Sequence, residues 1–290
     1  MTAVIAPVAE RTGGAPRDVQ RRRRLPLRVV ALLYVALLVG IPVGFLFGKA
    51  FSNGLGTFWH QITEPGAISA LELSAKVAAI AVPVNTVVGI GAGMLLARRR
   101  FFGKRILDLI FDVPIAISPI IIGLSLFLAY SRIGWLGPWL LSHGIMIVFS
   151  IPGVVIATMA VSLPYVLRSI VPVLVEIGET QEQAARTLGA GMWRRLFTIT
   201  LPAIRWALLY GIALTLARTL GEFGAVVIVS GNITQKTQTL PVYIYSAWDQ
   251  DFNDAGAFAG AIVLAAISIT VLVILSILRA RERRLRVDIA

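Results

Sequence analysis

A few charged residues lie inside long apolar runs of this sequence, where their types and spacing could do chemistry. Arg218 and Glu222 are four residues apart, so a helix would bring them onto one face, where they can form an ion pair. A charge inside an apolar span is costly unless it is paired or faces water. Two interpretations follow: a structural ion pair against a neighbouring span, or an Arg218 side chain that offers its charge to an anion in transit.

Polar residues follow this pair in the stretch SGNITQKTQT, which begins at Ser230 and contains Asn232. Their hydroxyl and amide groups, with the backbone N–H groups, suit a dianion better than fixed charges do if the ion must also leave. The alternative is an outer loop that contacts a partner protein or solvent. We therefore take Arg218, Glu222, Ser230 and Asn232 as the candidate residues of an anion pathway.

Other chemistries lack the residues that they need. The sequence has no cysteine, which excludes a disulfide scaffold, thiolate metal ligands and a cysteine nucleophile. No set of Ser, His and Asp is discernible, so we predict no catalytic residue. His60 and His143 have no second ligand at metal spacing, so we predict no metal site. We expect a protein that is not an enzyme and holds no cofactor of its own.

Membrane helices must position the candidate residues, because the composition is that of a membrane protein. Of the 290 residues, 57% are hydrophobic and only 14% are charged. An apolar run of about 20 residues is long enough to cross a bilayer. Six runs predict an all-α polytopic membrane protein with spans at 29–47, 71–97, 106–130, 145–166, 201–229 and 258–278.

The distribution of charge predicts the orientation of these spans. The net charge is +12, and most of the 27 lysines and arginines fall near the two ends and in segments 98–105 and 168–205. Such an excess is typical of cytoplasmic segments, so both termini are expected in the cytoplasm. The basic residues therefore indicate a multi-pass protein of the cytoplasmic (inner) membrane. They indicate the lipid bilayer, and not nucleic acid, as the partner.

The chain divides into three parts on this interpretation. Residues 1–28 are rich in Arg, Pro and Gly and are predicted to form a disordered cytoplasmic tail. Residues 29–279 form the transmembrane domain, and residues 280–290 form a basic cytoplasmic tail. One cytoplasmic loop, at about 176–202, is long enough to have structure of its own.

That loop contains TQEQAARTLGAGMWRRLFTITLP, from Thr180 to Pro202. Thr180 and Gln183 have the spacing of a capping box, which predicts the start of a short helix. Gly189 and Gly191 are expected to end it, and an amphipathic second helix follows. Pro202 then starts the next span. The loop either lies flat on the lipid as a connector or docks its alanine-rich helix into a partner's groove.

Two further charge clusters carry expectations. Glu72 and Lys76 are four residues apart with the acid leading, which favours an ion pair on one helix. Asp108 and Asp112 lie at the predicted cytoplasmic start of a span, where the helix dipole favours carboxylates. A proton relay is the alternative for the two aspartates.

Proline and glycine carry expectations about backbone shape. Pro114 and Pro119 follow closely in the predicted third span and are expected to kink or break it. Gly89, Gly91 and Gly93 form a cluster inside the second span. Close helix packing explains that cluster better than dinucleotide binding does.

The loop at 180–202 resembles the EAA signature of the membrane subunits of binding-protein-dependent ABC importers. That signature has an acidic residue, two alanines, a glycine after three further residues, and Ile-x-Leu-Pro nine residues later. The matching residues are Gln183, Ala184, Ala185, Gly189, Ile199, Leu201 and Pro202. Gln183 departs from the pattern, because it stands where the acidic residue usually lies, with Glu182 beside it. The resemblance implies the type I importer permease fold with six transmembrane helices, coupled to an ATPase subunit through these residues and Glu182.

Longer stretches are similar to the branch of these permeases that imports sulfate, molybdate and related oxyanions. They include LLARRRFFGKRILDLIFDVPIAISP from Leu95, SLPYVLRSIVPVL from Ser162 and ARTLGEFGAVVIVSGNITQKTQTLP from Ala217. The ending DQDFNDAGAFAGA is more similar to a sulfate permease subunit, whereas GNITQKTQTLP also resembles molybdate permeases. The resemblance implies import of sulfate, with thiosulfate as a further substrate and molybdate or tungstate as the alternative.

The resemblance also implies partners and a mechanism. ATPase subunits bind ATP and magnesium, an extracytoplasmic sulfate-binding protein delivers the anion, and a second, homologous permease subunit pairs with this chain as a heterodimer. The spans then open alternately to the two sides of the membrane. A self-contained secondary transporter that needs no ATP is the second hypothesis. No inverted repeat is evident for it, and the loop pattern would have no role there.

Overall fold

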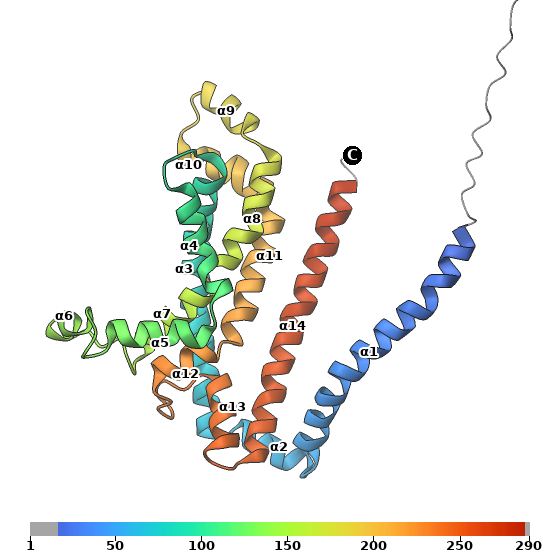
Figure 1. The fold of residues 1–290 in the computed structure, drawn as a ribbon, viewed down its shortest axis with the longest axis vertical. Coiled ribbons are helices and arrows are strands. Elements are labelled where there is room, and N and C mark those ends of the chain that lie inside the picture. Colours follow the sequence, from blue (N-terminus) through green and yellow to red (C-terminus); the bar gives the residue numbers. More distant parts are fainter. Residues whose placement is uncertain (1–16, 288–290) are drawn as a thin grey trace, which may run out of the picture. The chain divides into compact units, whose positions relative to one another are not determined.

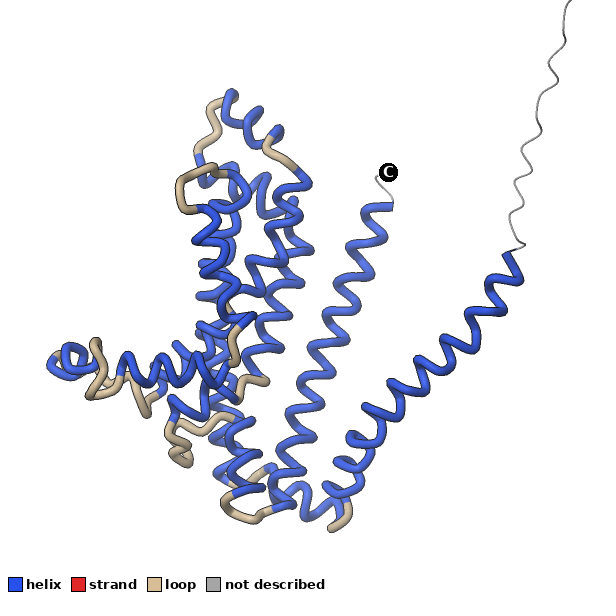
Figure 2. The backbone as a smooth tube through the Cα atoms, viewed as in Figure 1, coloured by secondary structure: helices blue, strands red, loops and turns tan. Residues whose placement is uncertain are grey.

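The structure is a computed structural model that describes residues 17–287. Every element of regular structure in this range is a helix, and Figure 2 shows the helices joined by loops. The chain divides into two compact units, Met1–Lys49 and Ala50–Ala290. Residues 1–16 and 288–290, which belong to the two predicted cytoplasmic tails, lie outside the described residues.

The first unit contains most of helix α1 (Arg17–Phe51). Its apolar part, Val29–Phe51, has 23 residues and a mean hydropathy of 2.6, enough to cross a bilayer. The helix begins at Arg17, so residues 17–28 of the predicted disordered tail are helical here. Arginine is a good helix former, and the apolar span that follows allows the helix to continue toward the N-terminus.

The second unit holds the other helices long and apolar enough to span a membrane. These are α3 (Pro65–Arg98), the combined run Ile151–Ile177, the run Met192–Leu220, and residues Asp254–Ile277 of α14 (Asp254–Val287). With α1 they make five candidate spans among the described residues, or up to six if a sharply bent helix pair counts as one span. Because α14 continues to Val287, residues 280–287 of the predicted basic tail are helical.

The bent pair is the predicted third span, and its break was expected from the two prolines. The chain bends by 111° between helices α4 (Lys104–Ala116) and α5 (Pro119–Tyr130). Residues Ile117 and Ser118 between them are extended, with ψ of 142° and 136°. A residue before proline avoids the helical region, so Pro119 enforces the break and begins the next helix. The expected break of the span at 106–130 is therefore confirmed, and it lies at Pro119.

The fourth and fifth predicted spans also differ from the structure at their ends. The fourth consists of α7 (Ile151–Ser162) and α8 (Pro164–Ile177), so it starts and ends later than the predicted 145–166. The fifth ends at Leu220, where α11 (Leu201–Leu220) stops, and the predicted residues up to 229 belong to a separate short helix, α12 (Gly224–Ser230). Gly221 supplies the C-cap of α11 and allows the chain to turn there.

Short helices complete the second unit at the ends of the spans. They are α2 (Gly54–Ile62), α6 (Gly137–Ser142), α9 (Thr180–Thr187), α10 (Met192–Arg195), the π-helical segment η1 (Leu196–Thr200) and α13 (Leu240–Asp249). Helix α12 packs against α5, and α13 packs against α14 and the start of α3. These contacts position the loop 231–239, which joins α12 to α13.

Helices α3, α8 and α11 pack side by side and form the core that carries α9 and α10 (Figure 1). One of the core clusters consists of Ile170 and Leu174 of α8 with Ile204 and Ala207 of α11. These residues recur at helical spacing, so each helix presents one apolar stripe to its neighbour.

Glycine allows these helix backbones to approach closely around Val166 of α8. A Cβ atom added to Gly89 of α3 would lie 2.8 Å from the Val166 Cβ, and one added to Gly211 of α11 would lie 3.0 Å from the Val166 Cα. Small residues at helix contacts are typical of membrane bundles. Gly93 is similarly close to Ile170, whereas Gly91 faces open space. The expected close packing is confirmed at Gly89 and Gly93 but not at Gly91.

Candidate functional site

The sequence-predicted coupling residues lie on α9, just after it at Gly189, in η1 and at the start of α11. Helix α9 begins at Thr180 with Glu179 as its N-cap, and no side chain caps it. The predicted capping box is therefore wrong, because Thr180 already lies inside the first turn. Gln183 contacts the N-cap residue instead of Thr180. Its side-chain amide donates to the Glu179 carboxylate at 3.4 Å, and its backbone N–H donates to the Glu179 carbonyl oxygen at 2.9 Å.

Gly189 ends α9, as the sequence predicts. Its φ of 82° lies in the left-handed region, which glycine adopts without steric cost. The N–H groups of Gly189 and Ala190 donate to the carbonyl oxygens of Arg186 and Ala185, both at 3.0 Å, and so satisfy the last turn. Gly191 has an ordinary φ of −65° and is the N-cap of α10, so it begins the next helix and does not end α9.

The predicted separate amphipathic helix is part of the fifth span. Helices α10, η1 and α11 form one continuous run, Met192–Leu220. Pro202 therefore lies within a helix already under way and does not start it. In η1 the N–H of Leu201 donates to the carbonyl oxygen of Leu196, five residues back. This wider turn adds one residue just before Pro202, whose missing N–H would otherwise interrupt the α-helical pattern.

Large apolar side chains are exposed at the end of this loop. Leu188 is 88% exposed, and Met192, Trp193 and Phe197 are exposed at 62% or more. We call these four residues the apolar tip. The rings of Trp193 and Phe197 are stacked, with centroids 6.2 Å apart. Gln183 and Ala184 are exposed beside the tip, and Ala185 is half-buried. Exposed large apolar side chains gathered in one short segment are typical of an interaction site.

Glu182 faces the opposite way, into the protein. Its carboxylate Oε1 lies 3.0 Å from Nη2 of Arg98, the last residue of α3, and accepts a hydrogen bond of 3.0 Å from the hydroxyl of Thr200 in η1. Nη1 of Arg98 donates to the carbonyl oxygen of Leu174 on α8 at 2.7 Å. The sequence analysis missed Arg98 and Thr200, because a run of three arginines gives no signal for which one is buried.

A cleft of ≈ 720 Å³ lies between the end of α3 and the segment from α9 to η1. Its charged lining consists of four arginines and two glutamates: Arg98, Arg99, Arg186, Arg195, Glu179 and Glu182. The last residues of the signature, from Ile199 to Pro202, attach this segment to the core. Ile199 is half-buried and Leu201 packs on the core cluster of Ile170 and Leu174, whereas Pro202 is exposed.

At the other end of α11, the predicted Arg218–Glu222 ion pair is present. Nη1 of Arg218 lies 2.6 Å from Oε2 of Glu222, in an ionic contact without hydrogen-bond alignment. The two do not share one helix face, because α11 ends at Leu220. Oε1 of Glu222 instead accepts a hydrogen bond of 2.8 Å from the N–H of Ala225, at the start of α12. Only 1% of the Glu222 side chain is exposed, against 28% of the Arg218 side chain.

Ser230 ends α12, and Asn232 lies two residues later in the loop to α13. Ser230 is completely buried, and its Oγ accepts a hydrogen bond from the N–H of Asn232 at 3.2 Å. The Asn232 amide donates to Gln250 at 2.9 Å and accepts from Gln238 at 2.9 Å. The hydroxyl of Thr237 donates to the Ser230 carbonyl at 2.6 Å. These two residues and the Arg218–Glu222 pair are thus held by separate sets of partners.

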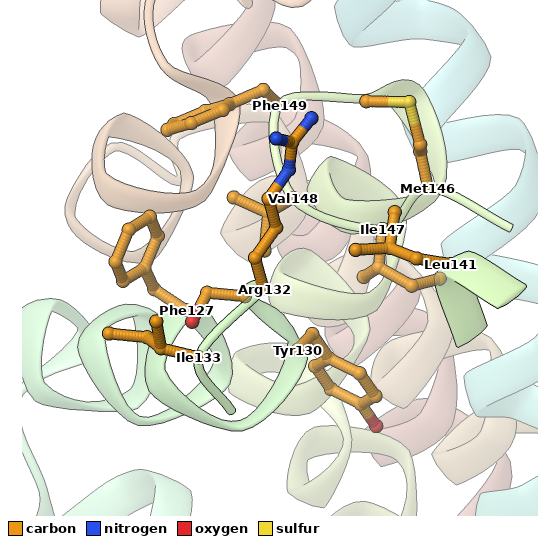
Figure 3. Close-up of a pocket in the computed structure, with 10 residues that line it drawn as sticks. Phe127, Tyr130, Arg132, Ile133, Leu141, Met146, Ile147, Val148 and Phe149 are labelled. Atoms are coloured by element: carbon orange, nitrogen blue, oxygen red, sulfur yellow. The ribbon is translucent and has the colours of Figure 1, made fainter. Parts of the chain in front are cut away.

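A second cavity, of ≈ 350 Å³, lies between the end of α5 and residues 146–149 (Figure 3). Its lining is mostly apolar, and Phe127, Tyr130 and Phe149 are among the side chains that Figure 3 shows around Arg132. Arg132 is the charged residue in this lining. The sequence analysis counted it only as a loop residue.

The remaining charge clusters have partners that only the fold reveals. Asp108 and Asp112 lie beyond the first turn of α4, so the expected interaction with the helix dipole is wrong. Both carboxylates instead contact Arg168 of α8, at 2.8 and 2.7 Å. The Glu72–Lys76 pair is confirmed at 2.7 Å, with both side chains 60% exposed.

Two tyrosines of α13, outside the candidate spans, have a raised pKa: Tyr243, and Tyr245 through its hydrogen bond with Asp249. Burial, followed by the nearby carboxylates of Glu64 and Asp251, raises the pKa of Tyr243 on α13 to about 12. Its hydroxyl therefore stays protonated at physiological pH. Among the residues that the structure describes, no three His, Cys, Asp or Glu side chains could together hold a metal ion.

Comparisons with known proteins give this architecture a family. Residues 89–285 match the family described as "Binding-protein-dependent transport system inner membrane component". The sulfate transport system permease protein CysW of Synechococcus elongatus is 44% identical to this chain over 262 residues, which cover 90% of the chain and 91% of that protein. The sulfate transport system permease protein CysT of Synechocystis is 36% identical over 256 residues, 88% and 89% of the two chains.

A solved structure shares the fold. The membrane chain of a bacterial ABC transporter involved in import of the acidic polysaccharide alginate has a TM-score of 0.70 and 18% identity, and the match covers 92% of this chain and 98% of that one. Identity this low supports the fold alone. With its family match over residues 89–285, this multi-pass chain belongs to the binding-protein-dependent transport system inner membrane components, the non-catalytic permease subunits of ABC transporters.

Proposed function

We propose that this chain is the transmembrane subunit of an ATP-driven importer that moves sulfate across the cytoplasmic membrane by alternating access. The observation that carries the substrate is the 44% identity to a sulfate permease along 90% of the chain. Thiosulfate has the same charge and nearly the same shape, so it is the first further substrate to test. Molybdate and tungstate are the competing substrates, because GNITQKTQTLP also resembles molybdate permeases.

In this proposal α9 and the residues after it couple the spans to an ATPase subunit. The proposed coupling residues are Glu182, Gln183, Ala184, Ala185, Gly189, Ile199, Leu201 and Pro202. The exposed Gln183, the small Ala184 and the apolar tip support docking into a groove, since small side chains let a helix backbone approach closely. Ile199 and Leu201 fasten the loop to the core, so a movement of the groove would reach α11 directly. ATP and magnesium bind to the partner ATPase.

The proposed anion pathway passes Arg218, Glu222, Ser230 and Asn232. Arg218 is the group that would contact the anion, because its side chain keeps 28% exposure while Glu222 is buried. Glu222 partly compensates this charge, which allows the anion to leave again. Ser230 and Asn232 are joined to their loop by hydrogen bonds, so their role would be to hold the shape of the pathway.

The proposed partners are ABC ATPase subunits, an extracytoplasmic sulfate-binding protein and a second, homologous permease subunit. The similarity to both CysW and CysT proteins supports a heterodimer, since two related kinds of sulfate permease then exist for one transport system.

Uptake of radiolabelled sulfate, in cells that carry or lack this chain, tests the proposal. We expect uptake that requires this chain and ATP and that excess thiosulfate suppresses more strongly than excess molybdate. Preferential loss of molybdate uptake in the deleted strain would overturn the substrate. Uptake that continues after ATP depletion would overturn the importer mechanism and favour a secondary transporter.

A further inference from the structure

Three spans and the coupling helix meet at one buried ion pair. Arg98 ends α3, and its guanidinium contacts both Leu174 near the end of α8 and Glu182 on α9. The same carboxylate oxygen of Glu182 accepts the hydroxyl of Thr200, the last residue before α11. A single guanidinium and a single carboxylate therefore connect α9 to α3, α8 and α11.

Burial makes this junction stiff. Only 11% of the Arg98 side chain and 16% of the Glu182 side chain are exposed, and Thr200 is 3% exposed. Water screens a pair weakly at such depth, and removal of one partner leaves the other charge buried without compensation. The arginine fork also fixes direction, because one planar group donates to two acceptors at once. The bond to Leu174 further satisfies one of the end carbonyls of α8.

We propose that Arg98, Glu182 and Thr200 form the joint that transmits movement of the coupling helix to the spans, with Arg98 and Thr200 as positioning residues. This inference rests on the proposed function and changes the role of Glu182 within it. Glu182 faces the protein interior, so it holds α9 in position, while the exposed Gln183 and the apolar tip make the contact with the ATPase. Removal of the charge of Arg98 or of Glu182 breaks this joint.

The test uses the complete transporter in proteoliposomes, with the second permease, the ATPase and the binding protein present. Two quantities are measured: sulfate moved per ATP hydrolysed, and ATPase retained when this chain is purified. We expect Glu182→Gln and Arg98→Gln to lower the ratio of sulfate to ATP by about tenfold or more, within the range typical of coupling between sites. The ATPase should remain bound in both variants.

Matched variants separate a joint from a merely structural contact. Arg100→Gln removes the same charge from an exposed arginine two residues away and should keep the wild-type ratio. Thr200→Val removes one hydroxyl at nearly constant volume and should lower the ratio by a smaller factor, whereas Thr200→Ser should preserve it. The exchange of Arg98→Glu with Glu182→Arg should recover part of the ratio, because the ion pair returns but the bond to Leu174 does not.

The outcomes distinguish failure of the joint from failure of the proposed importer function. A Glu182→Gln transporter with an unchanged ratio overturns the joint. Loss of the ATPase from the purified Glu182→Gln complex also overturns it, because Glu182 would then be a docking contact, yet the importer function would stand. If the Glu182 variant fails to insert, an unchanged ratio for Thr200→Val overturns the joint by itself. Sulfate transport by the wild type without ATP would instead overturn the proposed function.

Discussion

The guanidinium of Arg168 on α8 donates through Nε to the carboxylate of Asp112 on α4 at 2.7 Å. Its Nη2 reaches Asp108 as well, at 2.8 Å, so one arginine holds two carboxylates of the neighbouring helix. This contact joins α4 to the core helices just before the 111° break between α4 and α5.

Replacement of Arg168 should loosen α4. We expect Arg168→Gln to lower the free energy of unfolding by about 1 kcal/mol, because all three side chains are about a third or more exposed and solvent screens the contacts. Asp108→Asn should cost less, since Asp112 retains its hydrogen bond. Thermal unfolding in lipid nanodiscs measures both, with the exposed Arg100→Gln as control. A transition temperature for Arg168→Gln equal to that of the control would contradict a stabilising role for the contacts of Arg168 with Asp108 and Asp112.

The contact of Gly89 with Val166 predicts a sharp difference between neighbouring glycines. Gly89→Ala should destabilise the protein by about 1–3 kcal/mol, because the new Cβ would lie 2.8 Å from the Val166 Cβ. Gly91→Ala should be neutral or stabilising by about 0.5–1 kcal/mol, since nothing lies within 4 Å and alanine favours the helix. Thermal unfolding of the two variants side by side is the measurement. Equal effects would mean that α3 and α8 do not approach as described.

Gly189 should be sensitive through its backbone alone. Its φ is 82° and no atom lies within 4 Å of an added Cβ, so Gly189→Val meets conformational strain and no clash. We expect Gly189→Val to lower sulfate uptake and the stimulation of the ATPase by the binding protein, with normal insertion. Gly189→Asn should be milder, because asparagine tolerates this conformation better. Wild-type uptake by Gly189→Val would argue against a role for the end of α9 in coupling.

The Arg218–Glu222 pair allows charge and structure to be separated. Arg218→Gln alone leaves the Glu222 carboxylate, 1% exposed, without its cation and should harm assembly. The double variant Arg218→Gln with Glu222→Gln leaves no buried charge, and Glu222→Gln keeps the shape of the buried side chain, so we expect it to assemble. If Arg218 contacts the anion, sulfate uptake should be lost in this assembled variant. Retained uptake would assign the pair a structural role alone.

Sequence reasoning succeeded where a single residue determines the local backbone. Pro119 predicted the break of the third span, and Gly189 predicted the end of α9, because each residue restricts or permits particular dihedral angles. The same reasoning failed where a tertiary contact decides. Arg98 and Arg100 are alike in sequence, and only the position of α8 and α9 buries the first. Asp108 and Asp112 likewise gave no sign of Arg168, which lies far along the chain.

The capping box and the start at Pro202 failed for a related reason. A short helix does begin at Thr180, but its N-cap is Glu179, one residue before the pattern places it. At Pro202 the pattern constrains only one turn, and the longer helix that begins at Met192 passes through it. The Arg218–Glu222 pair was found from its spacing. Because α11 ends at Leu220, Glu222 also accepts a hydrogen bond from the backbone N–H of Ala225 at the start of α12. Local patterns thus identified the participants of the site better than its boundaries.

The π-helical segment Leu196–Thr200 determines the rotational phase between the coupling loop and the fifth span. An α-helix advances about 100° per residue, so one additional residue turns everything before it by roughly that angle relative to α11. Trp193 and Phe197 face solvent in the resulting orientation, while Thr200 faces Glu182. The extra residue thus sets the side of the chain on which the two aromatic rings are exposed.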